Sequence, residues 1–198
     1  MSLRFVTVCM AAMLLLGSCF VPSSLVFFEK DTQGKPNLVR NPGFAPVAGT
    51  KNTLSNWTIV NDETESAESV NLDDSVFLEG TNSIRIDSNP YAIMIVSDPF
   101  KVRRYGGYYI KVNALSSEAK GEKIELRFFT YNAAGKHINR FKTTLKTSTE
   151  WQKANISAGF LDTRSAFGRV AIFIPPFLKG TIWIDDAGAW EVHSFKID

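Results

Sequence analysis

The chain has 198 residues, of which 44% are hydrophobic and 21% charged, so it is globular and long enough for one domain rather than two. Its net charge of +2 includes no basic run and gives no electrostatic footprint for a nucleic-acid partner. Both cysteines, Cys9 and Cys19, lie in the N-terminal stretch, so the rest of the chain has no disulfide, thiol nucleophile or cysteine-bound zinc ion.

The first residues have the layout of an export signal. Arg4 supplies a positive charge, and the apolar run that follows, over residues 5–16, is too short to span about 30 Å of hydrocarbon. The run ends in Leu16-Gly17-Ser18-Cys19, which resembles the bacterial lipobox, where the cysteine is diacylated and becomes the new N-terminus. This resemblance predicts a signal peptide over residues 1–18 and an exported lipoprotein of the outer membrane or cell surface, held by lipid on Cys19 alone. An ordinary secretory signal that contains a cysteine is the alternative.

Residues 19–36 are expected to form a lipidated tether, because Pro, Ser and Gly interrupt regular structure there and charged residues keep the segment wet. The apolar run Leu25–Phe28 is the exception. We expect it to pack on the domain as a short strand.

Short alternating runs, separated by clusters of Gly, Asn, Asp and Ser, fill residues 37–198. Their length and spacing predict one all-β domain, a sandwich of two antiparallel sheets. The clearest expected strands are Ser83–Asp87, Tyr108–Asn113, Ile124–Tyr131, Phe141–Leu145, Val170–Ile174 and Thr181–Asp185. A hairpin loop is expected at Asn132-Ala133-Ala134-Gly135.

Alternation within these strands separates a core face from an outer face. Between Ile124 and Tyr131, the apolar face carries Ile124, Leu126, Phe128 and Thr130, and the other face carries Glu125, Arg127, Phe129 and Tyr131. The same division recurs in the strands that contain Arg85, Tyr109 and Phe173. If these strands share a sheet, its outer face offers aromatic rings for stacking on a sugar and polar groups for its hydroxyls. An ordinary solvated sheet face is the alternative interpretation.

Several motifs follow one another along the domain. They are Asn37-Leu38-Val39-Arg40-Asn41-Pro42-Gly43-Phe44, Trp57, Gly80-Thr81-Asn82-Ser83-Ile84-Arg85-Ile86, Tyr108/Tyr109, Ile124–Phe129, Thr149-Glu150-Trp151 and Ile182-Trp183-Ile184-Asp185-Asp186. In order and spacing they resemble carbohydrate-binding modules of the CenC type (families 4, 9, 16 and 22), over about residues 37–192. The resemblance implies a galactose-binding-like jelly roll with Trp57, Trp151 and Trp183 in its core.

The resemblance also implies a structural Ca²⁺ ion at the edge of the sandwich. Carried over by position, its ligands are the carbonyls of Gly43, Glu79 and Asn82 and the carboxylate of Asp185, with Asp186 as second choice. Ala45 stands where the family has a glutamate, so any such site is expected to bind calcium weakly.

For a carbohydrate ligand, the resemblance implies aromatic contacts on the concave sheet face or its rim. The matching residues are Tyr91 on the rim, Phe129 and Tyr131 in the centre and Phe173 on a neighbouring strand, with Glu125 and Arg127 as polar partners.

No nucleophile, histidine pair or phosphate-binding motif points to an enzyme. The acidic pairs Asp73-Asp74, Asp185-Asp186 and Glu63/Glu65 leave a glycosidase-like dyad as a minor alternative. We therefore expect a non-catalytic carbohydrate-binding lipoprotein of the cell envelope, whose partner is an oligo- or polysaccharide. The second hypothesis is an envelope adapter that contacts another protein through the same sandwich and has no affinity for sugars.

Overall fold

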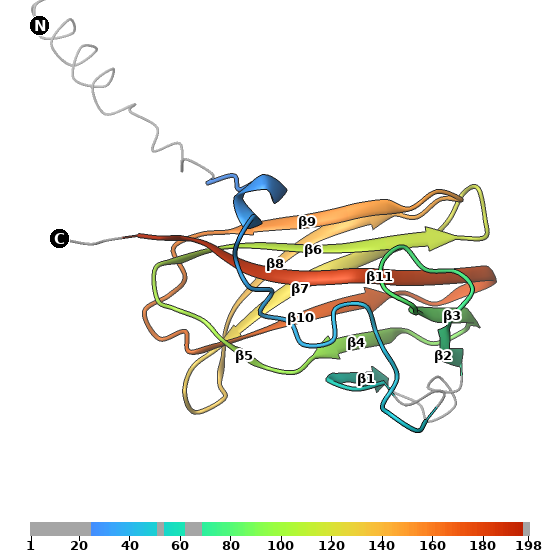
Figure 1. Cartoon of the computed structure of the whole chain (residues 1–198), viewed down its shortest axis with the longest axis horizontal. Helices are drawn as coiled ribbons and strands as arrows, with labels where there is room; N and C mark the ends of the chain where they lie inside the picture. Colours follow the sequence, from blue (N-terminus) through green and yellow to red (C-terminus); the bar gives the residue numbers. More distant parts are fainter. Residues whose placement is uncertain (1–24, 51–53, 62–68, 196–198) are drawn as a thin grey trace, which may run out of the picture.

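A computed structural model describes residues 25–50, 54–61 and 69–195, and shows two antiparallel sheets packed face to face (Figure 1). The first sheet has the strand order β1-β4-β10-β7-β8, with β5 also paired to β10, and the second has the order β2-β3-β11-β6-β9. The strands of the two sheets are β1 (Trp57–Asn61), β2 (Val70–Asp73), β3 (Ser83–Asn89), β4 (Ile93–Ser97), β5 (Phe100–Lys101), β6 (Gly106–Ser116), β7 (Lys123–Tyr131), β8 (His137–Lys146), β9 (Gln152–Ala158), β10 (Phe167–Ile174) and β11 (Phe177–Ser194). The expected all-β, two-sheet jelly-roll sandwich is therefore confirmed.

All six strands expected from alternation are present, each within a somewhat longer observed strand. The expected hairpin loop joins β7 to β8, where Gly135 takes the left-handed backbone conformation (φ 78°) that the turn requires. The core lies between the sheets, because each strand turns its apolar side chains inward. Phe128 of β7 is fully buried there, with its ring 5.9 Å from those of Tyr108 and Phe141 and 6.1 Å from that of Phe100.

The strands with mixed outer faces do not all share one sheet. β7 and β10 belong to the first sheet, whereas Arg85 on β3 and Tyr109 on β6 belong to the second. Their polar and aromatic side chains therefore lie on opposite sides of the sandwich. Alternation assigns each strand its two faces, but it carries no information on which sheet a strand joins.

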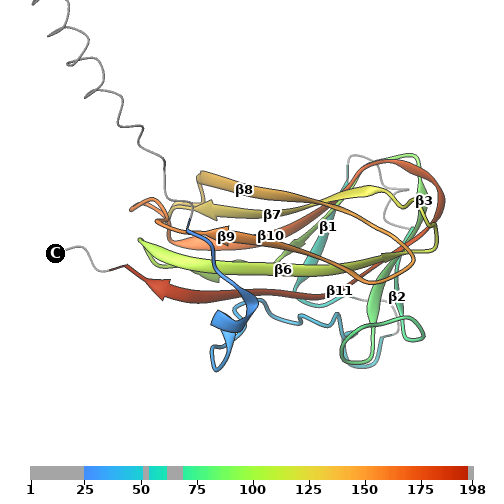
Figure 2. The same cartoon turned by 90° about the horizontal axis from the view of Figure 1, so that it is seen from above.

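Residues 25–36 pack on the outer face of the second sheet, on the far side of the sandwich from β7 and β8 (Figure 2). The Leu25–Phe28 run packs against the domain as expected, although not as a strand. The Phe27 backbone instead donates to the Ser157 hydroxyl at 2.9 Å and accepts from it at 3.1 Å. A single 3₁₀ turn (η1, Glu29–Thr32) follows.

The tryptophans expected in the core take different places. Trp57 is buried against Phe44, with ring centroids 5.0 Å apart. Trp151 and Trp183 are only half-buried and lie outside the core. Trp183 pairs with Arg85 in register, on the outer face of the second sheet, and its indole N–H donates to Asp73 at 2.9 Å. Within the described ranges no helix is long and apolar enough to cross a membrane.

Candidate functional site

The outer face of the first sheet, here called the front face, brings together most of the residues singled out in the sequence. Along β7, Glu125, Arg127, Phe129 and Tyr131 are partly exposed, whereas the residues between them are buried. The expected division of this strand into two faces is thus confirmed. Phe173 of β10 lies beside Glu125 in register, on the same face.

An aromatic cluster occupies one end of the front face. The rings of Phe129 and Tyr131 lie 6.5 Å apart, and His137, the first residue of β8, meets both edge-on at 5.6 and 5.7 Å. His137 lies between the expected hairpin loop and the expected strand Phe141–Leu145, and it belongs to a strand because β8 begins four residues before Phe141. The cluster presents partly exposed rings on a rigid sheet, which suits stacking against a flat ligand.

The polar residues in the middle of the front face are already paired. Glu125 accepts hydrogen bonds from Arg127 at 2.8 Å and from Lys142 at 2.9 Å. Hydrogen bonds from Lys142 and Arg127 hold the pKa of Glu125 below its usual value. The Arg127 guanidinium also lies 4.2 Å above the Phe173 ring. Glu125 and Arg127 thus form a fixed platform, in which the guanidinium keeps donors that are not used by Glu125.

Two arginines flank the aromatic cluster. Phe129 pairs in register with Arg169 of β10 on one side and with Arg140 of β8 on the other. Neither arginine side chain has a hydrogen bond or ion pair in the part of the chain that the structure describes. Their donors are therefore available to a ligand.

A groove of about 450 Å³ runs along the front face beside Tyr131. A volume of this size lies within the range of small-ligand sites. Its lining residues are Val60, Met94, Val96, Pro99, Tyr131, Ala133, Gly135, Phe167 and Arg169.

Tyr91 and Phe173 lie away from the aromatic cluster. Tyr91 is exposed in the turn between β3 and β4, two residues before Ile93, which pairs with Ile174 at the end of β10. Phe173 is opposite Glu125, six residues from Tyr131 along β7, which corresponds to about 20 Å in an extended strand. The predicted ligand-contacting residues therefore form two ends of one elongated face.

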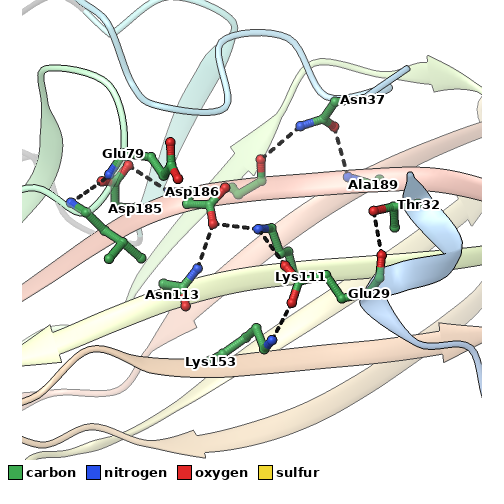
Figure 3. A network of polar contacts seen from close by, with 12 residues as sticks. Glu29, Thr32, Asn37, Glu79, Lys111, Asn113, Lys153, Asp185, Asp186 and Ala189 are labelled. Atoms are coloured by element: carbon green, nitrogen blue, oxygen red, sulfur yellow. Dashed lines mark hydrogen bonds and ion pairs between the residues drawn. The ribbon is translucent and has the colours of Figure 1, made fainter. Parts of the chain in front are cut away.

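Among the candidate calcium ligands, Asp185 lies on β11 of the second sheet, and Glu79 and Asn82 lie in the loop before β3. Asp185 is fully buried, and its carboxylate accepts backbone N–H groups from Leu78 at 2.7 Å, Glu79 at 2.9 Å and Asp186 at 2.7 Å (Figure 3). Burial raises the pKa of Asp185, against the effect of these hydrogen bonds. The loop thus turns N–H groups toward Asp185, whereas a calcium ion requires converging oxygens.

The other candidate ligands do not complete a cage of side chains. Asn82 has its side-chain oxygen hydrogen-bonded to Thr81, and Gly43 lies close to the Glu79 carbonyl. No group of three or more acidic or histidine side chains suited to a metal occurs within residues 25–50, 54–61 and 69–195. The Asp185 carboxylate thus anchors the loop at Leu78 and Glu79, and the calcium ion, whose other expected ligands are backbone carbonyls, stays a prediction.

Asp186 points away from Asp185 and joins a charged network under the N-terminal segment. Lys111 bonds to Asp186 at 2.6 Å and to Glu29 at 2.9 Å, and Glu29 also pairs with Lys153 (Figure 3). Hydrogen bonds from Lys153 and Lys111 lower the pKa of Glu29. These contacts fix η1 on the second sheet, so the front face stays uncovered by this segment.

Arg140, Lys142 and Arg169 are members of the site that the sequence patterns did not identify. A signal for them exists, because Arg140 and Lys142 alternate with Phe141 and Thr143, and Arg169 alternates with Gly168 and Val170. Their assignment to the face of Phe129 needed the strand order, which places β7 between β8 and β10.

The chain was compared with known proteins. It matches no protein-family model, and no curated protein sequence is similar to it. Among solved structures, it is similar to TmCBM61 in complex with β-1,4-galactotriose, with a TM-score of 0.60, 17% identity and coverage of 79% of this chain and 99% of that one. A structure described as CBM4 has a TM-score of 0.53 and 16% identity, covering 77% of this chain and 98% of that one.

Enzymes also contain this fold. The enzymatically active domain of tailspike protein 4 from bacteriophage CBA120 matches with a TM-score of 0.61 and 12% identity, over 78% of this chain but only 21% of that one. At these identities the similarity concerns the fold alone. The chain therefore has the jelly-roll β-sandwich fold of carbohydrate-binding modules.

Proposed function

We propose that this protein is a non-catalytic carbohydrate-binding lipoprotein of the bacterial cell envelope, which binds a glycan on its front face. The observation that carries the proposal is the partly exposed cluster of Phe129, Tyr131 and His137, beside two arginines whose side chains have no polar partner among the described residues. Aromatic rings stack on the C–H faces of sugars, and arginine donates to hydroxyls. A structural relative, TmCBM61, was solved with a galactotriose, which supports the same ligand class here.

The non-catalytic part of the proposal rests on what the acidic pairs do. Asp185 anchors a loop, and Asp186 bonds to Lys111 and Asn113. Asp73 accepts hydrogen bonds from Ser75 and from the Trp183 indole. These carboxylates stabilise the fold, while Glu63 and Glu65 lie outside the described residues.

Binding is tested on a glycan array with the full chain in a detergent that contains no sugar. We expect at least one glycan to bind, and Phe129→Ala and Tyr131→Ala to weaken it by roughly 5- to 30-fold, the effect of losing a stacked ring. Phe160→Ala is the matched control, because Phe160 is 56% exposed and lies outside the first sheet. No binding to any glycan would contradict the proposal and favour the adapter that contacts a protein.

The membrane anchor is tested separately, since residues 1–24 lie outside the described part of the chain. Cys19→Ala should abolish labelling by a radioactive fatty acid and release the protein from membranes. A Cys19→Ala protein that stays in the membrane fraction and starts at the same residue would contradict the lipobox prediction.

A further inference from the structure

The front face is much more basic than the chain as a whole, whose net charge is +2. Among the described residues, Glu125 is the one carboxylate on its strands, and it faces a larger set of cationic side chains. They are Lys101, Lys123, Arg127, Arg140, Lys142, Lys146 and Arg169. Asp98, which follows β4, accepts a hydrogen bond from Asn56 at 2.9 Å and forms no ion pair with any described residue. The described residues of this face therefore carry excess positive charge.

Part of this excess lies around the aromatic cluster. Glu125 pairs with Arg127 and Lys142, so the charges of these two side chains are partly neutralised. Arg140 and Arg169 have no such partner in the described chain, and they stand on either side of Phe129 in register. A ligand stacked on Phe129 would thus have a guanidinium available on each side.

We propose, building on the sugar-binding function above, that the glycan bound at this face is anionic and carries the carboxylate of a uronic acid. The planar fork of a guanidinium matches a carboxylate with two parallel hydrogen bonds. A uronate carboxylate projects from the edge of the sugar ring and leaves both ring faces free to stack on Phe129. Sulfate esters replace ring hydroxyls and add bulk around those faces. A site that both stacks on the sugar ring and offers guanidinium groups therefore favours a uronate over a sulfated sugar.

The test measures the affinity of the full chain for oligosaccharides of galacturonate, glucuronate and mannuronate/guluronate. Neutral β-1,4-galactan and β-glucan oligosaccharides of equal length provide the comparison. At least one uronate should bind more tightly than every neutral oligosaccharide, and its affinity should fall several-fold between 50 and 500 mM NaCl because salt screens exposed charges. Dextran sulfate, a single-stranded oligonucleotide and anionic phospholipid vesicles provide polyanions of other classes.

Two variants locate the effect. Arg140→Gln and Arg169→Gln should each weaken uronate binding by about tenfold, the effect of losing a hydrogen bond between charged groups. They should weaken neutral-glycan binding less than uronate binding, because glutamine can still donate to a hydroxyl but carries no charge. Arg104→Gln removes the same charge from an exposed arginine in the turn between β5 and β6, outside the front face, and should change neither.

The outcomes separate this inference from the function on which it rests. One outcome is that neutral glycans bind best, that their binding depends on Phe129 and that the arginine variants have no effect. This outcome would overturn the uronate proposal and leave the sugar-binding proposal intact. Binding to no glycan would overturn both. Equal or tighter binding to dextran sulfate, oligonucleotide or vesicles would overturn the uronate proposal in favour of a surface for polyanions in general.

Discussion

The pair Phe128 and Phe129 offers a contrast between two neighbours of the same residue type. Phe128 is fully buried among the rings of Phe100, Tyr108 and Phe141, and a Cβ on Gly168 would come within 2.7 Å of its ring. Phe128→Ala should therefore leave a cavity and cost about 3–5 kcal/mol of the free energy of unfolding. For a domain of this size, the melting temperature should fall by roughly 10 °C.

Phe129→Ala should behave differently, because its ring is partly exposed and contacts only Tyr131 and His137 among aromatic side chains. Its loss should cost about 1 kcal/mol of stability, the scale of an aromatic pair, and should weaken glycan binding. Urea unfolding followed by circular dichroism measures both variants, and Phe128→Leu, which keeps more of the apolar volume, should be less damaging than Phe128→Ala. If Phe129→Ala is the more destabilising of the two alanine variants, the assignment of the faces of β7 is inverted.

Three other predictions concern the second sheet. Hydrogen bonds from Ser75 and Trp183 outweigh burial and lower the pKa of Asp73 to about 2. At pH 7 the wild type should therefore exceed Asp73→Asn by about 2 kcal/mol in unfolding free energy, and this difference should fall below about 0.5 kcal/mol as the pH falls from 4 to 2. A difference still near 2 kcal/mol at pH 2 would refute this. Ala45 has no carboxylate to offer calcium, and the Asp185 carboxylate already accepts three backbone N–H groups. Millimolar Ca²⁺ should therefore raise the free energy of unfolding by no more than about 1 kcal/mol relative to chelator, and a larger increase, measured from the melting temperature, would contradict this. Glu29→Gln weakens the ion pairs with Lys111 and Lys153. The rate of amide hydrogen exchange at residues 25–36 should therefore rise, while the melting temperature changes by less than about 2 °C. An unchanged exchange rate would show that this network does not hold the segment on the sheet.

The sequence predicted the fold class and the faces of individual strands, because both depend on local alternation. Glu125 and Phe129 could be placed on one face of β7 since side chains in a strand alternate with a period of two. The short strand β1 and the nearly continuous apolar run of β4 gave no such alternation, and both were missed.

Strand order is a non-local property, and it accounts for most of the remaining differences. Arg140 and Arg169 join Phe129 only because β7 lies between β8 and β10. Trp183 is a different case: it alternates with the buried Ile182 and Ile184, which indicates the outer face where it bonds to Asp73, and its expected core position was implied by the family resemblance. The N-terminal segment was expected as a tether because its composition is polar, yet Glu29 binds two lysines that are far away in the sequence.

A crystal structure of the full chain with its tightest-binding oligosaccharide tests the central claim most directly. Our account predicts a sugar ring stacked on Phe129 or Tyr131, with Arg140 or Arg169 within hydrogen-bond distance of its polar groups. A sugar bound instead at the loops of the sandwich ends, or on the outer face of the second sheet beside Trp183 and Trp190, would contradict it.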